Sequence, residues 1–166
     1  MKKLIVFFTL LCFALVFTSC QKDNSVDDIQ SSYNSVDGIN EFKKALKENN
    51  ILFNTEEIEE QSEFAVIPEK RASFIIDGER VIVYRFSSFK DAEEYKSKFD
   101  IGGCTIGNNK ISWAGYPHFY QKWNLIIEYV GYSDDVVKNL ENILGKEFSG
   151  YYAVGNKSPL TGAVAR

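Results

Sequence analysis

The chain has 166 residues and a formal net charge of −4 at pH 7, with 45% hydrophobic and 14% aromatic residues. This length and apolar content suit one domain with a single hydrophobic core. An acidic chain without a basic cluster is a poor candidate for binding nucleic acid, because neutralising phosphates supplies most of that affinity.

The first twenty residues, MKKLIVFFTLLCFALVFTSC, predict export. Two lysines precede an apolar run over residues 4–17, which is short for a membrane span and typical of a secretory signal peptide. The ending Phe17-Thr18-Ser19-Cys20 resembles the lipobox of bacterial lipoproteins, which implies that Cys20 receives a diacylglycerol. The alternative is an ordinary signal peptide, cut near Ser19, that leaves Cys20 as a free thiol.

We therefore expect four segments along the chain. They are a signal peptide over residues 1–19, a lipidated Cys20 with a polar tether over residues 20–36, a globular domain over residues 37–148 and a flexible tail over residues 149–166. The tether is rich in Asp, Ser, Asn and Gln, which is typical of a solvated linker.

The predicted location is the cell envelope, where the lipid on Cys20 anchors the domain to a membrane. The start of the tether, CQKDN, resembles the signal found after the lipidated cysteine in some Gram-negative lipoproteins that reach the outer face of the outer membrane. The alternative is a polar linker without a targeting signal. In a cell with one membrane, the expected place is the outer face of that membrane.

Cysteine usage limits how the domain can be stabilised. Cys12 lies in the predicted signal peptide and Cys20 is the predicted acylation site, so Cys104 is the one thiol left in the exported domain. No intramolecular disulfide can form, and the fold must depend on its hydrophobic core.

A helix and a group of strands are predicted after the tether. Asp37 is a suitable N-cap, and apolar residues recur at helical spacing until Asn49-Asn50, which can end a helix. Residues 56–66 contain an acidic strand. Residues 72–77 and 79–86 alternate around Asp77-Gly78, a pair that favours a two-residue hairpin turn.

Two more helices and a second group of strands follow. Ser88 and Asp91 form a capping box, and Ser133 precedes an amphipathic helix that ends at Gly145. Between them, residues 125–130 have the character of a central strand buried on both faces. The predicted fold is a single α+β domain, with about three helices on a mainly antiparallel sheet of hairpins, in the order α, two or three strands, α, two strands, α.

Residues 113–132, WAGYPHFYQKWNLIIEYVGY, hold both tryptophans, the single histidine and four of the nine tyrosines. We expect a rigid aromatic binding surface here. The alternative is that these rings pack at the margin of the core with their polar atoms satisfied. The candidate surface consists of Trp113, Tyr116, His118, Tyr120 and Trp123.

The pattern W…PHFY…LIIxYVG in this stretch, with the preceding hairpin and the following helix, resembles a family of small secreted bacterial lipoproteins. The likeness covers residues 39–148. It implies a single exported domain and brings no known activity.

The sequence contains no motif of a known catalytic or metal site. It lacks Gly-x-Ser-x-Gly, Gly-x-x-x-x-Gly-Lys-Ser/Thr and His-Glu-x-x-His. One histidine and one available thiol are too few for a structural zinc site, and the glutamates of residues 56–60 lack the loop spacing that wraps calcium. We expect no cofactor and no metal.

The predicted function is a membrane-anchored, non-catalytic module that binds a protein, peptide or glycan partner in the envelope or outside the cell. One alternative is a small hydrolase or thiol enzyme that uses Cys104 and His118. Another is a proteinaceous inhibitor made of two α+β repeats, because FKKA at residues 42–45 is similar to FKDA at residues 89–92.

The lipid anchor yields a first testable prediction. Cys20→Ser removes the acylated thiol, so the chain should leave the membrane fraction or accumulate as an unprocessed precursor. Fractionation with metabolic labelling by a palmitate analogue measures this, and Cys104→Ser, the control, should keep the label. An unlabelled, soluble wild-type chain would contradict the lipoprotein interpretation.

Overall fold

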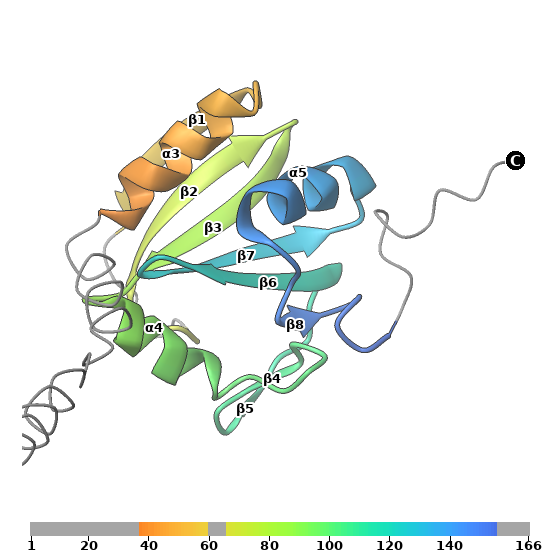
Figure 1. The fold of residues 1–166 in the computed structure, drawn as a ribbon. Coiled ribbons are helices and arrows are strands. Elements are labelled where there is room, and N and C mark those ends of the chain that lie inside the picture. Colours follow the sequence, from red (N-terminus) through yellow and green to blue (C-terminus); the bar gives the residue numbers. More distant parts are fainter. Residues whose placement is uncertain (1–36, 60–65, 156–166) are drawn as a thin grey trace, which may run out of the picture.

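The computed structural model describes residues 37–59 and 66–155 (Figure 1). The signal peptide and tether predicted over residues 1–36 lie outside the described residues, as do residues 60–65 and 156–166. The helices are α3 (Gly38–Glu48), α4 (Phe89–Lys96) and α5 (Asp134–Leu144). The strands are β1 (Phe53–Glu59), β2 (Lys70–Ile76), β3 (Glu79–Arg85), β4 (Thr105–Ile106), β5 (Asn109–Lys110), β6 (Tyr116–Lys122), β7 (Leu125–Gly131) and β8 (Ser149–Gly150).

Six strands form one antiparallel sheet in the order β1-β2-β3-β7-β6-β8, and β4 and β5 form a separate small hairpin. This architecture confirms the predicted α+β domain with helices on a mainly antiparallel sheet. The strand β7 is the apolar run expected at the centre, and it pairs with β3 on one side and β6 on the other. The two-residue strands were not predicted, because so short a segment has no period to detect.

Each helix begins at the polar residue predicted to cap it. The Asp37 carboxylate and the hydroxyls of Ser88 and Ser133 accept a backbone N–H from the first turn at 3.2, 3.1 and 3.3 Å. These acceptors satisfy donors that a helix start otherwise leaves unpaired. The helix α5 ends at Gly145, whose φ of 88° is one that glycine tolerates.

The turn between β2 and β3 lies where the sequence predicts it. Asp77 and Gly78 have φ angles of 52° and 82°, and Ile76 pairs with Glu79 across the turn. Two consecutive positive φ angles are the mark of the type I′ turn, whose twist matches that of the flanking strands.

The sheet is covered by helices on both faces (Figure 1). Side chains of α3 and α5 pack on one face, which we call the α3/α5 face, and α4 with the segment after it packs on the other, the α4 face. The α3/α5 face includes the core residues Phe42, Leu46, Phe74, Val83, Tyr120, Leu125, Ile127, Tyr129, Val137 and Leu140. The α4 face includes Ile67, Tyr84, Phe86, Ala92, Ile106, Phe119 and Ile126.

The predicted tail needs a correction. Ser149 and Gly150 form β8 and pair with Phe119 and His118 of β6, and the backbone from residue 151 to 155 turns back over the same end of the sheet (Figure 1). Residues 149–155 therefore belong to the folded domain rather than to a flexible tail. The sequence of this segment has no amphipathic pattern from which its structure could be predicted, because individual contacts hold it in place rather than a periodic apolar face.

None of the helices within residues 37–59 and 66–155 combines the length and apolar character required to cross a membrane.

The I′ turn yields a second testable prediction. Gly78→Val should lower the free energy of unfolding by about 1 to 2 kcal/mol, because a β-branched residue would be forced to a left-handed backbone conformation. A Cβ at Gly78 meets nothing within 4 Å, so strain rather than a clash is the cause. Urea denaturation measures the change, and Glu79→Val, one residue outside the turn, should leave stability nearly unchanged. Equal midpoints for the two variants would contradict this account.

Candidate functional site

The five residues predicted to form one aromatic surface lie in three different environments. Trp113 packs on the α4 face, where its ring lies 5.8 Å from Phe119 and its Nε1–H donates to the Gly103 carbonyl at 2.7 Å. Tyr116 lies at the start of β6 with 40% of its surface exposed. The expected single surface is therefore not present.

His118 and Tyr120 must be corrected from surface to core. They share the α3/α5 face of β6, as alternation predicts, but 1% of His118 and none of Tyr120 is exposed. Burial and the nearby Glu147 and Glu141 raise the pKa of the Tyr120 hydroxyl far above its usual range. This hydroxyl has no hydrogen-bond partner among the described residues.

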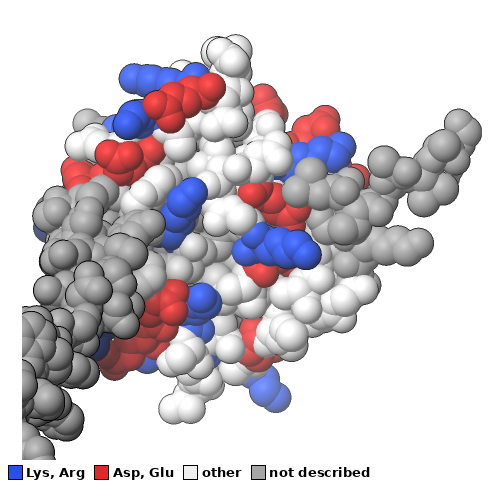
Figure 2. All heavy atoms as spheres, viewed as in Figure 1, with Lys and Arg blue, Asp and Glu red and all other residues white. Residues whose placement is uncertain are grey.

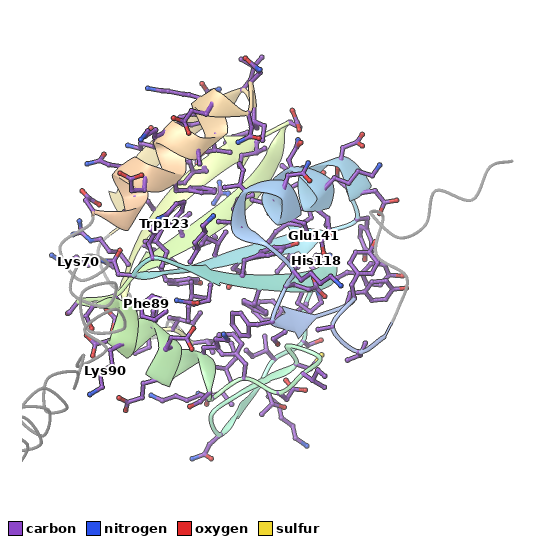
Figure 3. All side chains as sticks on the ribbon, viewed as in Figure 1. Lys70, Phe89, Lys90, His118, Trp123 and Glu141 are labelled. Carbon is purple, nitrogen blue, oxygen red and sulfur yellow. The ribbon has the colours of Figure 1, made fainter. Side chains whose placement is uncertain are left out.

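Trp123 lies at the opposite end of the β6–β7 hairpin from His118 (Figure 3). It is the first residue of the turn, with a φ of 52° that is unusual for a bulky side chain. Its ring is half-buried against the α3/α5 core, and the Lys122 ammonium lies 5.0 Å from the ring centroid. Trp123 and Tyr116 therefore do not form one local patch, because the length of β6 separates them.

Three tyrosines, only one of them predicted, form the exposed aromatic group at this end of the sheet. We call Tyr116, Tyr132 and Tyr151 the tyrosine patch. The Tyr116 ring stacks on that of Tyr151 with centroids 3.8 Å apart and an angle of 7°, and it meets the Tyr132 ring edge-on at 4.9 Å. Tyr132 is 68% exposed, so the patch presents ring faces and edges to solvent.

Strand pairing explains why these three tyrosines meet. Tyr116 pairs with Gly131 across β6 and β7, which places the next residue, Tyr132, beside it. The Tyr151 N–H donates to the Pro117 carbonyl at 2.9 Å. Residues far apart in the sequence are thus brought to one corner by the end of the β6–β7 ladder.

A buried ionisable pair lies beneath the patch. His118 Nδ1 is 2.6 Å from Glu147 Oε2, and both side chains are 2% exposed. The imidazole lies between two aromatic rings, those of Tyr129 at 5.6 Å and Tyr152 at 5.3 Å. With the carboxylate as acceptor, this contact is a hydrogen bond from the Nδ1–H of the imidazole to Glu147 Oε2.

The second oxygen of Glu147 fixes the segment that carries Tyr151. Glu147 Oε1 accepts the backbone N–H groups of Tyr152 at 2.5 Å and Ala153 at 2.6 Å. Gly150 precedes this segment with a φ of 138°, and a Cβ there would lie 2.3 Å from the Pro117 carbonyl oxygen. Glu147 and Gly150 together hold the chain tightly against β6, which sets the position of the Tyr151 ring.

The thiol and the imidazole of the enzymatic alternative lie on opposite faces of the sheet. The neighbour of Cys104, Gly103, sits over the Phe119 ring on the α4 face, and the exposed Cys104 thiol points to the Gly102 carbonyl at 3.7 Å. His118 is enclosed on the α3/α5 face. This geometry gives no support to a thiol–imidazole pair.

The two segments compared as repeats also differ in position. The helix α3 packs its apolar residues on the α3/α5 face, whereas Ala92 of α4 packs on the α4 face. A duplicated unit of helix and hairpin would place its helices alike, so the arrangement does not favour the repeat-type inhibitor.

Neither a continuous basic area on the face drawn in Figure 2 nor a cluster of metal-binding groups is found among the described residues. Acidic and basic side chains alternate on the face shown in Figure 2, without a continuous basic area. In residues 37–59 and 66–155, no three His, Cys, Asp or Glu side chains gather in a group that could hold a metal ion.

Comparison of the chain with protein-family models, with curated proteins and with solved structures found no match. The site must therefore be interpreted from its own geometry.

The buried pair yields a third testable prediction. Glu147→Ala should lower the free energy of unfolding by about 3 to 5 kcal/mol, because it leaves a buried imidazole and two backbone N–H groups without an acceptor. Urea denaturation measures the loss, and amide hydrogen exchange should show it first at Tyr152 and Ala153. Glu48→Ala, which removes an exposed carboxylate 4.0 Å from Lys44, is the control and should cost less than about 1 kcal/mol. A similar small effect for both variants would contradict a central role for the pair.

Proposed function

We propose that this protein is an exported, lipid-anchored binding module that recognises a protein, peptide or glycan partner through the tyrosine patch and performs no catalysis of its own. The observation that carries the proposal is the packing of Tyr116, Tyr132 and Tyr151 against one another at an exposed corner of a rigid sheet. The sequence supplies the anchor, through the lipobox that ends at Cys20 and the polar tether after it.

Exposed tyrosines suit recognition because of their physical character. A tyrosine ring offers a large apolar area and a polar tip at a low cost in side-chain entropy, and such rings are enriched at binding interfaces. In the patch, each ring is already held by a neighbour, and the Tyr132 hydroxyl donates to the Ala114 carbonyl at 3.1 Å. Little freedom would be lost on binding, which favours affinity.

The position of the patch relative to the tether also supports this function. The tether joins the domain at α3, where the Gly38 N–H donates to Asn124 Oδ1 at 3.1 Å in the β6–β7 turn. The patch lies at the other end of β6, which at ~3.3 Å per residue is roughly 20 Å away. A domain held at the α3 end would thus present its tyrosines away from the membrane.

A fourth prediction tests the patch directly. Tyr132→Ala should abolish capture of a partner from envelope extract or on a glycan array, with the urea midpoint nearly unchanged because the ring is mostly exposed. Tyr116→Ala should reduce the same capture. Leu52→Ala, which truncates an 84% exposed apolar residue outside the patch, is the matched control and should bind as the wild type does.

Two outcomes would contradict the proposal. If Tyr132→Ala and Tyr116→Ala still capture every molecule that the wild-type chain captures, the patch is not the binding surface. If the wild-type chain captures nothing in either format, the binding function itself is not supported.

A further inference from the structure

A small polar hollow lies on the α4 face, away from the tyrosine patch. It has a volume of about 140 Å³ and is lined by Arg71, Ser73, Arg80 and Ile82. A hollow of this size suits one small head group rather than a whole metabolite. The helix α4 packs over β6 and β7, whereas the hollow lies over β2 and β3.

Strand register places these side chains together. Ser73 pairs with Ile82 across β2 and β3. Arg71 pairs with Tyr84 two residues along the ladder, and Arg80 pairs with Ile75 two residues in the other direction. Side chains two residues apart on a strand share a face. The two guanidinium groups therefore flank the Ser73–Ile82 pair from both sides.

A carboxylate flanks the Ser73–Ile82 pair on each side across the sheet. Glu56 pairs with Ser73 on the β1 side, and Glu128 pairs with Ile82 on the β7 side. Glu56 Oε2 accepts a hydrogen bond from the Ser73 hydroxyl at 3.1 Å and lies 3.1 Å from Arg80 Nη2. Glu128 Oε2 accepts from the Tyr84 hydroxyl at 3.1 Å.

The Arg80–Glu56 contact can be exchanged for a ligand at little cost. The two side chains are 59% and 48% exposed, and a surface ion pair of this kind contributes only about 0 to 1 kcal/mol. A guanidinium has five donors in a planar fork that fits a carboxylate or a phosphate. An entering anion could thus take the place of the Glu56 carboxylate while Ser73 donates its hydroxyl hydrogen to it.

Glu128 makes the charge of this region depend on pH. Burial raises the pKa of Glu128 to about 7, against the opposing effects of the Tyr84 hydrogen bond and of Arg71. Its cross-strand neighbours are Ile82 on β3 and Phe119 on β6, which cannot compensate its charge. Glu56 also lies on this side of the sheet, beside Ser73, and Glu69 lies near Asp91 and Tyr95 of α4.

We propose that the hollow lined by Arg71, Ser73, Arg80 and Ile82 is a binding site for a small oxyanion, namely a carboxylate or phosphate group. The arginines supply the charge, Ser73 supplies a neutral donor and Ile82 supplies an apolar floor. Protonation of Glu128 removes a competing negative charge beside the site. Anion binding is therefore coupled to proton uptake and weakens as the pH rises through about 7.

The experiment uses the full chain as the cell processes it, labelled with ¹⁵N and held in a non-ionic detergent. Sodium phosphate and sodium acetate are titrated at pH 6, with sodium chloride at matched ionic strength as the baseline. Saturable shifts of the Nε–H signals of Arg71 and Arg80 are expected with at least one probe. The probe that binds distinguishes a phosphate site from a carboxylate site.

Variants separate the hollow from general charge effects. Arg80→Gln should weaken binding at least tenfold, and because Arg80 is largely exposed the variant should fold. Arg85→Gln removes the same charge from the same strand, but Arg85 shares the opposite face with Val83, so it should bind as the wild type does. Equal weakening in both variants, or shifts no larger than those with chloride, would overturn the proposal.

The coupling to Glu128 is tested with acetate, whose charge does not change between pH 6 and pH 8. Wild-type affinity should fall several-fold over this range, and Glu128→Gln should bind equally at both values. Measurements of unfolding free energy against pH provide a second check of the Glu128 titration. Because the folded pKa lies above the unfolded value near 4.5, wild-type stability should fall as the pH rises from about 5 to about 7, and Glu128→Gln should lose this pH dependence. A pH-independent wild-type affinity would overturn the coupling.

Discussion

The buried contact between His118 and Glu147 is the interaction on which one whole end of this molecule depends. Removing an imidazole and a carboxylate from water is costly, and such a pair persists only when its remaining polar atoms are satisfied. Glu147 meets this condition by accepting from His118 and from two backbone N–H groups. It ties β6 to residues that follow α5, which places the Tyr151 ring against Tyr116.

The tyrosine patch and the arginine-lined hollow lie at different places on the sheet. Tyrosines gather where β6 begins, while α3 begins beside the turn of the β6–β7 hairpin. The arginine-lined hollow lies on the α4 face, in the part of the sheet formed by β2 and β3. Binding at one location would therefore not block the other.

Local signals in the sequence predicted most of the fold. The capping residues Asp37, Ser88 and Ser133 and the turn pair Asp77-Gly78 act through atoms within a few residues, so their consequences can be derived without the rest of the chain. The same holds for the apolar run of β7. Alternation also places His118 and Tyr120 on one face of β6, but alternation alone does not say whether a face meets solvent or a helix.

The sequence by itself determined where the three helices and the β2–β3 hairpin form, and that aromatic residues are concentrated near β6. The tertiary structure alone decided which aromatic residues are exposed: α5 packs over Tyr120, Glu147 and Tyr152 enclose His118, and the backbone after β8 brings Tyr151 to Tyr116. The reason is physical. Helix caps and turns depend on short-range hydrogen bonds and backbone angles, whereas exposure depends on which distant element packs over a side chain, and no local pattern contains that information.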